Sequence, residues 1–366
     1  MNDKVALAMS GGVDSSVAAY LLLKEGYEVV GFHMKTVPDE VFNLIPEKKK
    51  VCCSPTDTLD AAKVAEQLGI EFHVIHIEED FRRDVIEYFK SEYIKGRTPN
   101  PCAVCNREIK FGLIMDKIMK DTSFNFYSTG HYARRYCETE SKRCLLKKGI
   151  DSAKDQTYFL ATIEPERLSK ILFPIGDYSK EQIRKLAKEL GIHVYSKKES
   201  QEICFIPDND YHRFLKEEMK DTVQPGDMVD KNGIVLGTHE GLAFYTIGQR
   251  RGLGLATGEK IYVSKLNAEK NEIIAAPRKD LYSKGLIASK LNWYIPYEEV
   301  EKQYRGRIKC KIRKTSPEAE ASLRFLDINR IEVSFNTKQF AITPGQLAVF
   351  YHEDTVLGSG FIERAL

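Results

Sequence analysis

Residues 8–16 read Ala8-Met9-Ser10-Gly11-Gly12-Val13-Asp14-Ser15-Ser16 and lie between a short apolar run and a helical pattern. Glycines let the backbone curl with its N–H groups pointing inward, and the start of the following helix adds a partial positive charge, so this turn favours a phosphate. The serines supply further hydrogen-bond donors. Asp14 is placed either to cap the helix or to help hold a magnesium ion. The loop lacks the lysine of a Walker A loop, which excludes that class of ATPase.

The pattern around the glycine-rich turn predicts a doubly wound α/β domain. Strand-like apolar runs at 5–9, 27–34, 72–77 and 124–129 alternate with helical patterns, of which the clearest lie at 58–68, 81–94 and 109–119. Connections of this length join parallel strands through crossover helices. We therefore expect a parallel sheet covered on both faces, with the glycine-rich turn directly after its first strand.

Two further regions follow the expected parallel sheet. The centre is helical and more polar, and Ser179-Lys180-Glu181-Gln182 has the spacing of a capping box at the start of a helix that Gly191 closes. From residue 225 onward, short alternating strands predict antiparallel β structure in one or two small barrels, with examples at 261–266, 308–312, 331–335 and 347–351. We divide the chain into three domains at 1–172, 173–224 and 225–366.

The composition is that of an ordinary soluble, multidomain enzyme. Of the 366 residues, 42% are hydrophobic and 30% are charged, which excludes intrinsic disorder and a disulfide-stapled miniature. No apolar run approaches the roughly 18 residues that cross a bilayer, and no signal peptide is visible, so we expect a cytoplasmic protein that does not enter a membrane. A net charge of +2 does not by itself require a nucleic acid. Eight cysteines then favour reduced thiols, metal ligands or catalysis over structural disulfides.

Two loops carry cysteines that are suited to sulfur chemistry. Cys102 and Cys105 form a Cys-x-x-Cys in a proline-bracketed loop that continues into a helix, and Cys204 lies in a separate loop. A thiol near a helix start, with Arg107 and Lys110 close by in sequence, is expected to have a lowered pKa and more of the nucleophilic thiolate. A thiolate that carries a sulfane sulfur needs a second thiol to release it, and the two loops would supply that pair.

Metal binding is the alternative interpretation of these cysteines. Cys-x-x-Cys is half of a structural zinc site, and Cys52-Cys53 could supply the rest, although adjacent cysteines make poor tetrahedral partners. Cys102, Cys105 and Cys204 could instead hold a 4Fe–4S cluster with one iron left open to bind sulfide. Three further cysteines are interpreted as strand or hairpin residues, namely Cys137, Cys144 and Cys310.

The whole chain resembles one family, the tRNA-specific 2-thiouridylases, whose SGGxDS pyrophosphatase loop (PP-loop) splits ATP between its α- and β-phosphates. The resemblance runs end to end through AMSGGVDSS at 8–16, GFHMK at 31–35, GRTPNPCAVCNREIKFG at 96–112, TGHYAR at 129–134, KDQTYFL at 154–160, ESQEICFI at 199–206, TIGQRRGLG at 246–254 and TPGQLAVFY at 343–351. It implies that the chain replaces the 2-oxygen of the wobble uridine in tRNA with sulfur.

The resemblance assigns roles to individual positions. It makes Cys105 the nucleophile and Cys204 the persulfide carrier, and it places ATP on residues 8–15, flanked by Met34 and Gly130. The residues that it places at the target base are Asn100, Pro101 and Cys102, and those that it places against tRNA are His131, Lys154, Asp155, Gln156 and Gln346.

Three residues from these sets also have a simpler interpretation. From the residues alone, His131 would equally be a hydrogen-bonded structural histidine, and Lys154-Asp155 a solvated helix start. The chain departs from many relatives at Cys102, where they carry an aspartate that is a possible general base. It departs again at Lys314-Thr315-Ser316, where relatives often carry an Arg-Tyr pair.

The implied reaction uses ATP and Mg²⁺. The uridine 2-oxygen is adenylated, Cys204 carries a persulfide from an upstream sulfur-donor protein, and Cys105 resolves the intermediate to leave a Cys105–Cys204 disulfide. One alternative keeps the tRNA thiolation but uses a 4Fe–4S cluster on the three cysteines. An alternative from another class is an ATP-pyrophosphatase small-molecule ligase, which has no obvious use for the Cys204 loop.

The stretch 302–314 holds seven basic residues and no acidic one. Period-2 alternation puts four cations on one face of a strand, Arg307, Lys309, Lys311 and Arg313, and three apolar residues on the other, Ile308, Cys310 and Ile312. Like charges on one strand face repel each other, and nothing local in the sequence neutralises them. We expect this basic face to contact tRNA phosphates, with a solvated outer face as the alternative.

Overall fold

The structure is a computed structural model that describes residues 2–36, 55–197, 203–206, 210–220, 222–256 and 258–366. Cys52-Cys53 and residues 199–202 of the ESQEICFI segment lie outside the described residues. The chain forms two compact units. Unit 1 comprises Met1–Val85, Cys102–Asp210 and Asp354–Val356, and unit 2 comprises Ile86–Pro101, Tyr211–Glu353 and Leu357–Leu366. The division into three domains stays a prediction.

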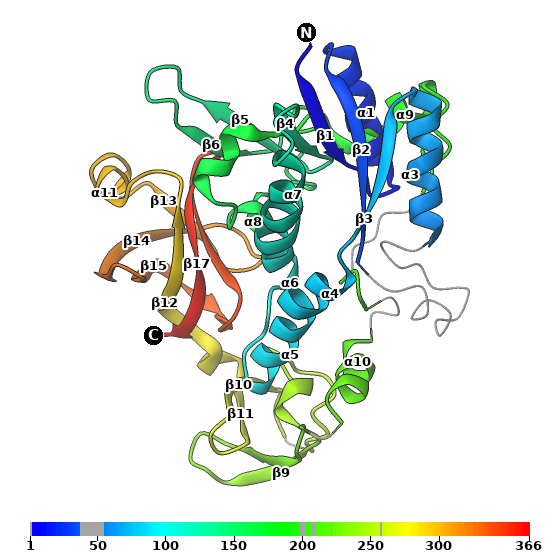
Figure 1. Ribbon diagram of the computed structural model, residues 1–366. Coiled ribbons are helices and arrows are strands. Elements are labelled where there is room, and N and C mark those ends of the chain that lie inside the picture. Colours follow the sequence, from blue (N-terminus) through cyan, green and yellow to red (C-terminus); the bar gives the residue numbers. More distant parts are fainter. Residues whose placement is uncertain (1, 37–54, 198–202, 207–209, 221, 257) are drawn as a thin grey trace. The chain divides into compact units, whose positions relative to one another are not determined.

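Unit 1 is built on a five-stranded sheet with the strand order β3-β2-β1-β4-β7 (Figure 1). Every pairing in it is parallel. The strands are β1 (Lys4–Ala8), β2 (Glu28–Lys35), β3 (Glu71–His76), β4 (Phe126–Thr129) and β7 (Ile171–Leu172). β2 and β3 lie on one side of β1, and β4 lies on the other. Because crossovers between parallel strands are right-handed, reversing the direction in which strands are added places helices on both faces of the sheet. The predicted doubly wound α/β fold is confirmed.

The core of unit 1 explains why the apolar runs became strands and helices. Val5 and Leu7 of β1 are fully buried, and Val17 and Leu22 of the first helix pack in the same cluster. Three helices share this packing, α1 (Val13–Lys24), α3 (Pro55–Leu68) and α9 (Lys180–Glu189). The predicted capping box of α9 is confirmed: the Ser179 side chain accepts from the Gln182 backbone, and the Gln182 side chain accepts from the Ser179 backbone.

A continuous helix carries the Cys-x-x-Cys. It begins as α6 (Pro101–Val104), continues as a π-helical segment, Cys105–Ile114, and ends as α7 (Met115–Met119). The sequence pattern predicted its start at residue 109, which is wrong because proline is well suited to the first turn of a helix and starts this one eight residues earlier. The preceding helical region consists of α4 (Glu78–Phe81), a π-helical turn, Arg82–Ile86, and α5 (Glu87–Ile94).

A β-hairpin in unit 1 contains a disulfide. Its strands are β5 (Ala133–Cys137) and β6 (Cys144–Lys148), and the cross-strand neighbours Cys137 and Cys144 are bonded to each other. The hairpin interpretation of these two cysteines is confirmed, but the preference for reduced thiols, metal ligands or catalysis over structural disulfides does not hold for this pair. Strand pairing brings the two Cα atoms within 4.0 Å, a proximity that a spacing of seven residues did not reveal.

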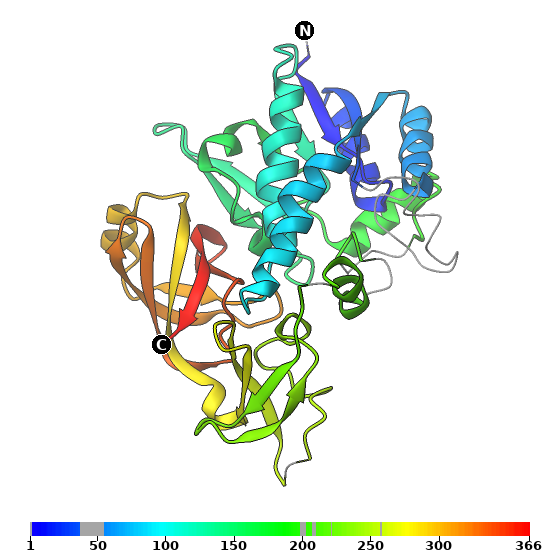
Figure 2. The ribbon, with the colours of Figure 1, turned by 60° about the horizontal axis from the view of Figure 1, so that its bottom comes forward.

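Unit 2 contains two β regions, within the predicted one or two (Figure 2). One pairing in the first of them, residues 272–274 with residues 227–229, is parallel, so the prediction of purely antiparallel structure is wrong there. A four-stranded sheet has the order β10-β11-β8-β9, formed by β8 (Gly226–Val229), β9 (Val235–His239), β10 (Ile261–Asn267) and β11 (Glu272–Pro277). An antiparallel barrel has the order β12-β15-β14-β13-β16-β17 and is closed by the pairing of β12 with β17. Its strands are β12 (Tyr282–Trp293), β13 (Ile308–Lys311), β14 (Ala319–Asp327), β15 (Arg330–Phe340), β16 (Leu347–His352) and β17 (Thr355–Ala365).

The remaining helices of unit 2 are α10 (Tyr211–Glu218) and α11 (Tyr297–Tyr304). Closing the barrel removes the strand edges that an open sheet would expose. Among the described residues, no helix combines the length and the apolar character that crossing a membrane requires.

Strand β13 confirms the predicted alternation but corrects its electrostatics. Ile308 and Cys310 are buried, whereas Arg307 and Lys309 are exposed. The sequence predicted that nothing local neutralises these four charges. This is wrong for Lys309, because the register places Glu320 of β14 directly opposite it. The Arg313 guanidinium, moreover, donates to two backbone carbonyls, those of Phe340 and Ala341. Of the four cations, Lys309 therefore has an acidic neighbour directly across the strand pair.

Candidate functional site

The glycine-rich turn lies where an open parallel sheet binds ligands. It follows the carboxyl end of β1, whose neighbours β2 and β4 are connected in opposite directions, and α1 begins directly after it at Val13. Such a topological switch point leaves a crevice at the carboxyl ends of the strands. Gly12 is the N-cap, and no side chain caps the helix. The N–H groups in the first turn of α1 thus donate no hydrogen bond to a capping side chain, and a phosphate fits this position.

Two glycines allow the backbone to close tightly around this turn. Gly11 has φ +70°, and a Cβ atom there would lie 2.2 Å from the Asp57 carbonyl oxygen. Gly130, directly after β4, would place a Cβ atom 2.7 Å from the Ser15 backbone nitrogen. A larger residue at either position would displace the backbone that forms the turn. Both glycines were singled out from the sequence, and Met34 lies at the end of the neighbouring strand β2.

Asp14 is held by partners that are distant in sequence. The Lys180 ammonium nitrogen lies 2.8 and 2.9 Å from its two carboxylate oxygens, and the Tyr132 hydroxyl donates to it at 2.8 Å. The expectation that Asp14 caps α1 is wrong, because its side chain is directed to these two groups and Gly12 occupies the cap position. The carboxylate instead joins the glycine-rich turn to the segment after β4 and to α9.

A second lysine holds the turn from another side. The Lys197 ammonium nitrogen lies 2.9 Å from the Gly11 carbonyl oxygen, 2.6 Å from Asp57 and 2.5 Å from Asp60. Burial would lower the pKa of Lys197, but the hydrogen bonds to the two carboxylates outweigh it and raise the pKa. For Asp60, burial would raise the pKa, but the bonds from Lys197 and His193 outweigh it and hold the pKa below its usual value. Lys197 therefore stays charged at neutral pH.

Cys105 lies in a more apolar environment than the sequence suggested. It is a partly buried, free thiol four residues after the start of its helix, rather than at the helix N-terminus. Burial raises its pKa, and the positive charge of Lys110 opposes this effect without overcoming it. The expected lowered pKa is therefore wrong. Cys102, one turn earlier, is exposed.

The two cysteine segments approach a common element. Phe205, the residue after Cys204, makes an edge-to-face contact with Phe81 of α4 at 5.8 Å between ring centroids. Helix α4 also packs against the π-helical segment that begins at Cys105. Both segments therefore contact α4, and the pairing of the two thiols stays a prediction. Cys204 is itself partly buried.

Two residues of the KDQTYFL segment that were predicted to contact tRNA, Asp155 and Gln156, instead form hydrogen bonds within the protein. The Asp155 carboxylate is buried and accepts from the Gly149 and Thr157 backbones and from the Thr157 hydroxyl. A solvated helix start is thus the wrong interpretation of Asp155, because the carboxylate closes a turn. The Gln156 side chain accepts from the Tyr132 backbone at 2.8 Å. Lys154, in contrast, is partly exposed.

His131 and Gln346 also have protein partners. A ring nitrogen of His131 lies 2.8 Å from the Thr129 hydroxyl, and burial lowers the pKa of His131 well below its ordinary value, so the ring is neutral at neutral pH. In unit 2, the Gln346 amide donates to the carbonyls of Thr98 and Pro99 at 3.2 and 2.9 Å. It holds the loop that leads to Asn100, which is buried, and to Pro101.

Comparison with known proteins covers the whole chain. Residues 3–208 match the family model described as the tRNA methyl transferase HUP domain, residues 212–277 its PRC-barrel domain, and residues 283–362 an aminomethyltransferase beta-barrel domain. The chain is 48% identical over 364 residues to the tRNA-specific 2-thiouridylase MnmA of Thermotoga maritima, covering 99% of both chains. The chain belongs to the tRNA-specific 2-thiouridylase family.

A second relative agrees with this assignment. The tRNA-specific 2-thiouridylase MnmA 2 of Thermoanaerobacter pseudethanolicus is 46% identical over 366 residues, covering 100% of this chain and 99% of the relative. Among solved structures, a 4-thiouridine synthetase–RNA complex with bound ATP aligns over 60% of this chain and 51% of that chain, with 17% identity and a TM-score of 0.36. This last similarity is too low to support an inference.

The metal alternatives gain no support from the positions of the described cysteines. Within the described residues, no group of three or more His, Cys, Asp or Glu side chains lies close enough to hold a metal ion. Cys102, Cys105 and Cys204, all described, therefore do not form a cluster site in this conformation. The zinc alternative also needs Cys52-Cys53, which lie outside the described residues.

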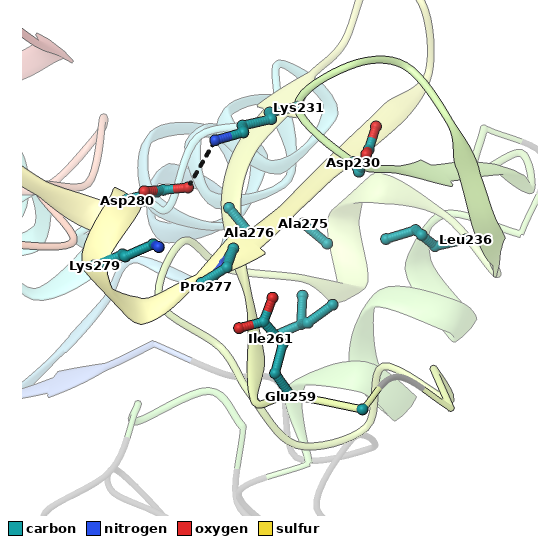
Figure 3. A pocket seen from close by; sticks show the side chains of 11 residues that line it. Asp230, Lys231, Leu236, Glu259, Ile261, Ala275, Ala276, Pro277, Lys279 and Asp280 are labelled. Atoms are coloured by element: carbon teal, nitrogen blue, oxygen red, sulfur yellow. Dashed lines mark ion pairs between the residues drawn. The ribbon is translucent and has the colours of Figure 1, made fainter.

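A pocket of about 550 Å³ lies in unit 2 (Figure 3). Asp230, Leu236 and Ile261 line it together with Lys231 and Asp280, which form an ion pair at 3.7 Å. None of the residues that carry the family resemblance line this pocket, so its size does not make it the candidate site.

Sequence reasoning missed three residues of the site, Tyr132, Lys180 and Lys197. Tyr132 lies within the TGHYAR segment and Lys180 within the capping box, so both stretches were noticed for other reasons. Their partners, however, are 118 and 166 positions away, at Asp14. A lysine or tyrosine has no local pattern that reveals so distant a partner, and only tertiary packing brings them to the turn.

Proposed function

We propose that this chain catalyses the ATP-dependent 2-thiolation of the wobble uridine in tRNA by adenylating the 2-oxygen and replacing it with sulfur from a cysteine persulfide. It is a tRNA-uridine 2-sulfurtransferase by family. The observation that carries the proposal is the uncapped start of α1 after a glycine-rich turn at the switch point of a parallel sheet. This is a site for a polyphosphate, and it lies in the same unit as both reactive cysteines.

In the first step the uridine 2-oxygen attacks the α-phosphorus of ATP. A bond forms between them, the bond to the oxygen that bridges to the β-phosphate breaks, and the electron pair leaves with pyrophosphate. Residues 8–15, Met34 and Gly130 are the proposed ATP site, with the backbone N–H groups at the start of α1 directed at the phosphates. Adenylation matters because an amide-like oxygen is a poor leaving group, whereas AMP is a good one.

In the second step sulfur replaces the activated oxygen. The terminal sulfur of a Cys204 persulfide attacks the uridine C2, and AMP leaves with the oxygen. The Cys105 thiolate then attacks the Cys204 sulfur, which releases 2-thiouridine and leaves a Cys105–Cys204 disulfide for a thiol reductant. The shared packing of both segments on α4 supports this pairing. Because burial raises the pKa of Cys105, the positive charge of Lys110 is the group that favours its thiolate.

The proposed partners are tRNA and a persulfide-donating protein. Asn100, Pro101 and Cys102 are the proposed contacts to the target base, and the residues proposed to contact the rest of the tRNA are His131, Lys154, Asp155, Gln156 and Gln346. The hydrogen bonds of Asp155, Gln156 and Gln346 within the protein make positioning the main part of their role. A magnesium ion would be held by the ATP phosphates with at most one carboxylate, that of Asp14, because Mg²⁺ is commonly bound in this way. When bound, it would neutralise phosphate charge.

One incubation tests the proposal directly. Unmodified tRNA, ATP, magnesium and a persulfide donor are combined with the protein, and the digested nucleosides are analysed by mass spectrometry. We expect 2-thiouridine at the wobble position, with AMP and pyrophosphate formed in equal amounts. Thiolation without consumption of ATP, or ATP cleavage that depends on a small molecule rather than on tRNA, would contradict it.

A further inference from the structure

We propose that Tyr127 is a further residue of the sulfur-transfer site and that its hydroxyl donates a hydrogen bond to the anionic sulfur of Cys105. The inference rests on the proposed function, in which Cys105 reacts as a thiolate, and adds to it a donor from the neighbouring strand β4. Tyr127 precedes the TGHYAR segment and lies in none of the segments that carry the family resemblance. Its role has to be argued from the structure.

The Tyr127 hydroxyl is a buried polar group whose hydrogen-bonding capacity is not used. The residue is 0% exposed, and within the described part of the chain its hydroxyl oxygen has no hydrogen-bond partner. Burying a hydroxyl without a hydrogen bond costs free energy, and a phenylalanine would fill almost the same space without that cost. A hydroxyl kept in such a place calls for a partner that is present in another state of the protein.

The fold holds this tyrosine against the segment that carries the nucleophile. Strand β4 is an interior strand of the parallel sheet, where Tyr127 pairs with Ala6 on one side and Ile171 on the other. The Tyr127 ring makes an edge-to-face contact with Phe111, with 5.9 Å between the ring centroids. Phe111 is fully buried and belongs to the π-helical segment that begins at Cys105. The hydroxyl is therefore positioned by a rigid strand and by direct packing on this segment.

The state of the Cys105 sulfur decides whether the hydroxyl has a partner. Burial raises the pKa of Tyr127, and a negative charge on Cys105 raises this pKa further, so the hydroxyl lies within electrostatic range of the thiolate. A protonated thiol is a weak hydrogen-bond acceptor, whereas an anionic sulfur is a strong one. Because its pKa is raised, Tyr127 keeps its proton in the range where the thiol ionises, and it can donate to the thiolate as soon as that forms.

The proposed sulfur transfer needs such a donor. Burial raises the pKa of Cys105, and the charge of Lys110 opposes this effect without overcoming it. The other titratable ring packed on Phe111 is His131, which is neutral and offers no charge. A hydrogen bond to the charged form lowers a thiol pKa. A decrease of one unit raises the thiolate fraction about tenfold below the pKa and lowers its nucleophilicity only about threefold, so the thiol reacts faster.

Alkylation of Cys105 by iodoacetamide as a function of pH, in the full chain without ATP or tRNA, tests the inference. We expect Tyr127→Phe to move the midpoint of the profile upward by about one pH unit and to slow the reaction about threefold below both midpoints. The urea midpoint should stay equal or rise, because an unsatisfied buried hydroxyl is removed. The matched control is Tyr294→Phe in unit 2, a buried tyrosine whose hydroxyl is hydrogen-bonded with Asn292. It should lower the urea midpoint and leave the Cys105 profile unchanged.

A purely structural role for the Tyr127 hydroxyl gives a different result. An unchanged Cys105 profile in Tyr127→Phe overturns the inference, whether or not the urea midpoint falls. If Tyr127→Phe does not fold, Tyr127→Met decides in the same way, because it also lacks the hydroxyl and its flexible side chain can fill the space. Failure of the unaltered protein to thiolate tRNA would instead overturn the proposed function, and it is distinguishable because the alkylation contains neither ATP nor tRNA.

Discussion

The side-chain nitrogen of Lys197 lies 2.9 Å from the backbone carbonyl oxygen of Gly11. The glycine-rich turn and the chain that leads toward Cys204 are thus joined by one hydrogen bond across 186 positions of sequence. The same ammonium group contacts Asp57 and Asp60 of α3. A single side chain therefore connects the proposed ATP loop, the helix beside it and the chain preceding the proposed sulfur carrier.

Replacing Lys197 by methionine should destabilise unit 1 and loosen the turn. The substitution leaves Asp57 and Asp60 facing each other without their cation, and we expect a decrease of about 1–3 kcal/mol in the free energy of unfolding. Urea denaturation measures the decrease. Lys188→Met, an exposed lysine of α9, is the matched control and should change the free energy of unfolding by less than about 0.5 kcal/mol.

The same variant should change the response to acid. Because the folded-state pKa of Asp60 is depressed, the stabilisation from its ion pair is present above about pH 4 and is lost as the pH falls through the depressed value. Without Lys197 that pKa should return toward its unfolded value, so the free energy of unfolding of Lys197→Met should decrease less between about pH 7 and pH 3 than that of the unaltered protein. An equal decrease of the free energy of unfolding with falling pH in the two proteins would contradict this coupling.

Gly11→Val and Asp14→Ala should each abolish thiolation and pyrophosphate release while leaving tRNA affinity within a few-fold. A valine at position 11 must adopt φ +70° and place its Cβ atom against the Asp57 carbonyl. Gly69→Ala is the control, since Gly69 has φ +67° but no atom within 4 Å of the added Cβ, and it tests backbone strain alone. Full activity in Gly11→Val would refute the ATP site.

Serine substitutions separate the two sulfur mechanisms. Cys105→Ser and Cys204→Ser should each stop turnover, since a hydroxyl does not carry sulfane sulfur at a useful rate. Cys102→Ser should keep substantial activity if the persulfide route holds. Loss of nearly all activity, together with loss of visible absorbance in anaerobically purified Cys102→Ser, would indicate a 4Fe–4S cluster instead. Iron and sulfide analysis of the purified protein gives an independent answer.

Alkylation should report the raised pKa of Cys105. Because burial keeps this thiol protonated, its reaction with iodoacetamide should become fast only at a pH above the ordinary thiol range, about 8.5. Lys110→Met should move the profile to still higher pH, since the lysine charge favours the thiolate. Peptide mass spectrometry distinguishes Cys105 from the exposed Cys102, which serves as the internal comparison. A Cys105 profile centred below that of Cys102 would show that the thiolate is stabilised instead.

The basic face of β13 predicts a salt-dependent contribution to tRNA binding. Changing Arg307 and Lys309 together to glutamine should weaken all tRNA substrates alike. The slope of the logarithm of the binding constant against the logarithm of the salt concentration should also become shallower, by roughly 0.7–0.9 for each phosphate that the protein no longer neutralises. Glu320 opposite Lys309 makes the larger part of this effect come from Arg307. The control is the change of two exposed lysines of β12, Lys284 and Lys290, together to glutamine, because it removes the same amount of charge. An unchanged affinity and salt slope would mean that β13 faces only water.

The sequence by itself determined the fold class and the position of the glycine-rich turn. Period-2 and helical patterns are local properties of the chain, so the parallel sheet, the capping box at Ser179 and the two faces of β13 followed from them. The position of the glycine-rich turn after β1 followed as well, because a turn between a strand and a helix is contiguous in sequence. The family resemblance then named the chemistry.

Only the tertiary structure decided which partners the site residues have. Asp14 is paired with Lys180 from 166 positions away, and Cys137 is bonded to Cys144 because a hairpin aligns them. The pKa of Cys105 is raised, not lowered, because burial depends on everything packed around the thiol and not on the basic residues that follow it in sequence. Periodic patterns report which face of an element is buried, whereas electrostatics depends on distances between elements, and those distances exist only once the chain has packed.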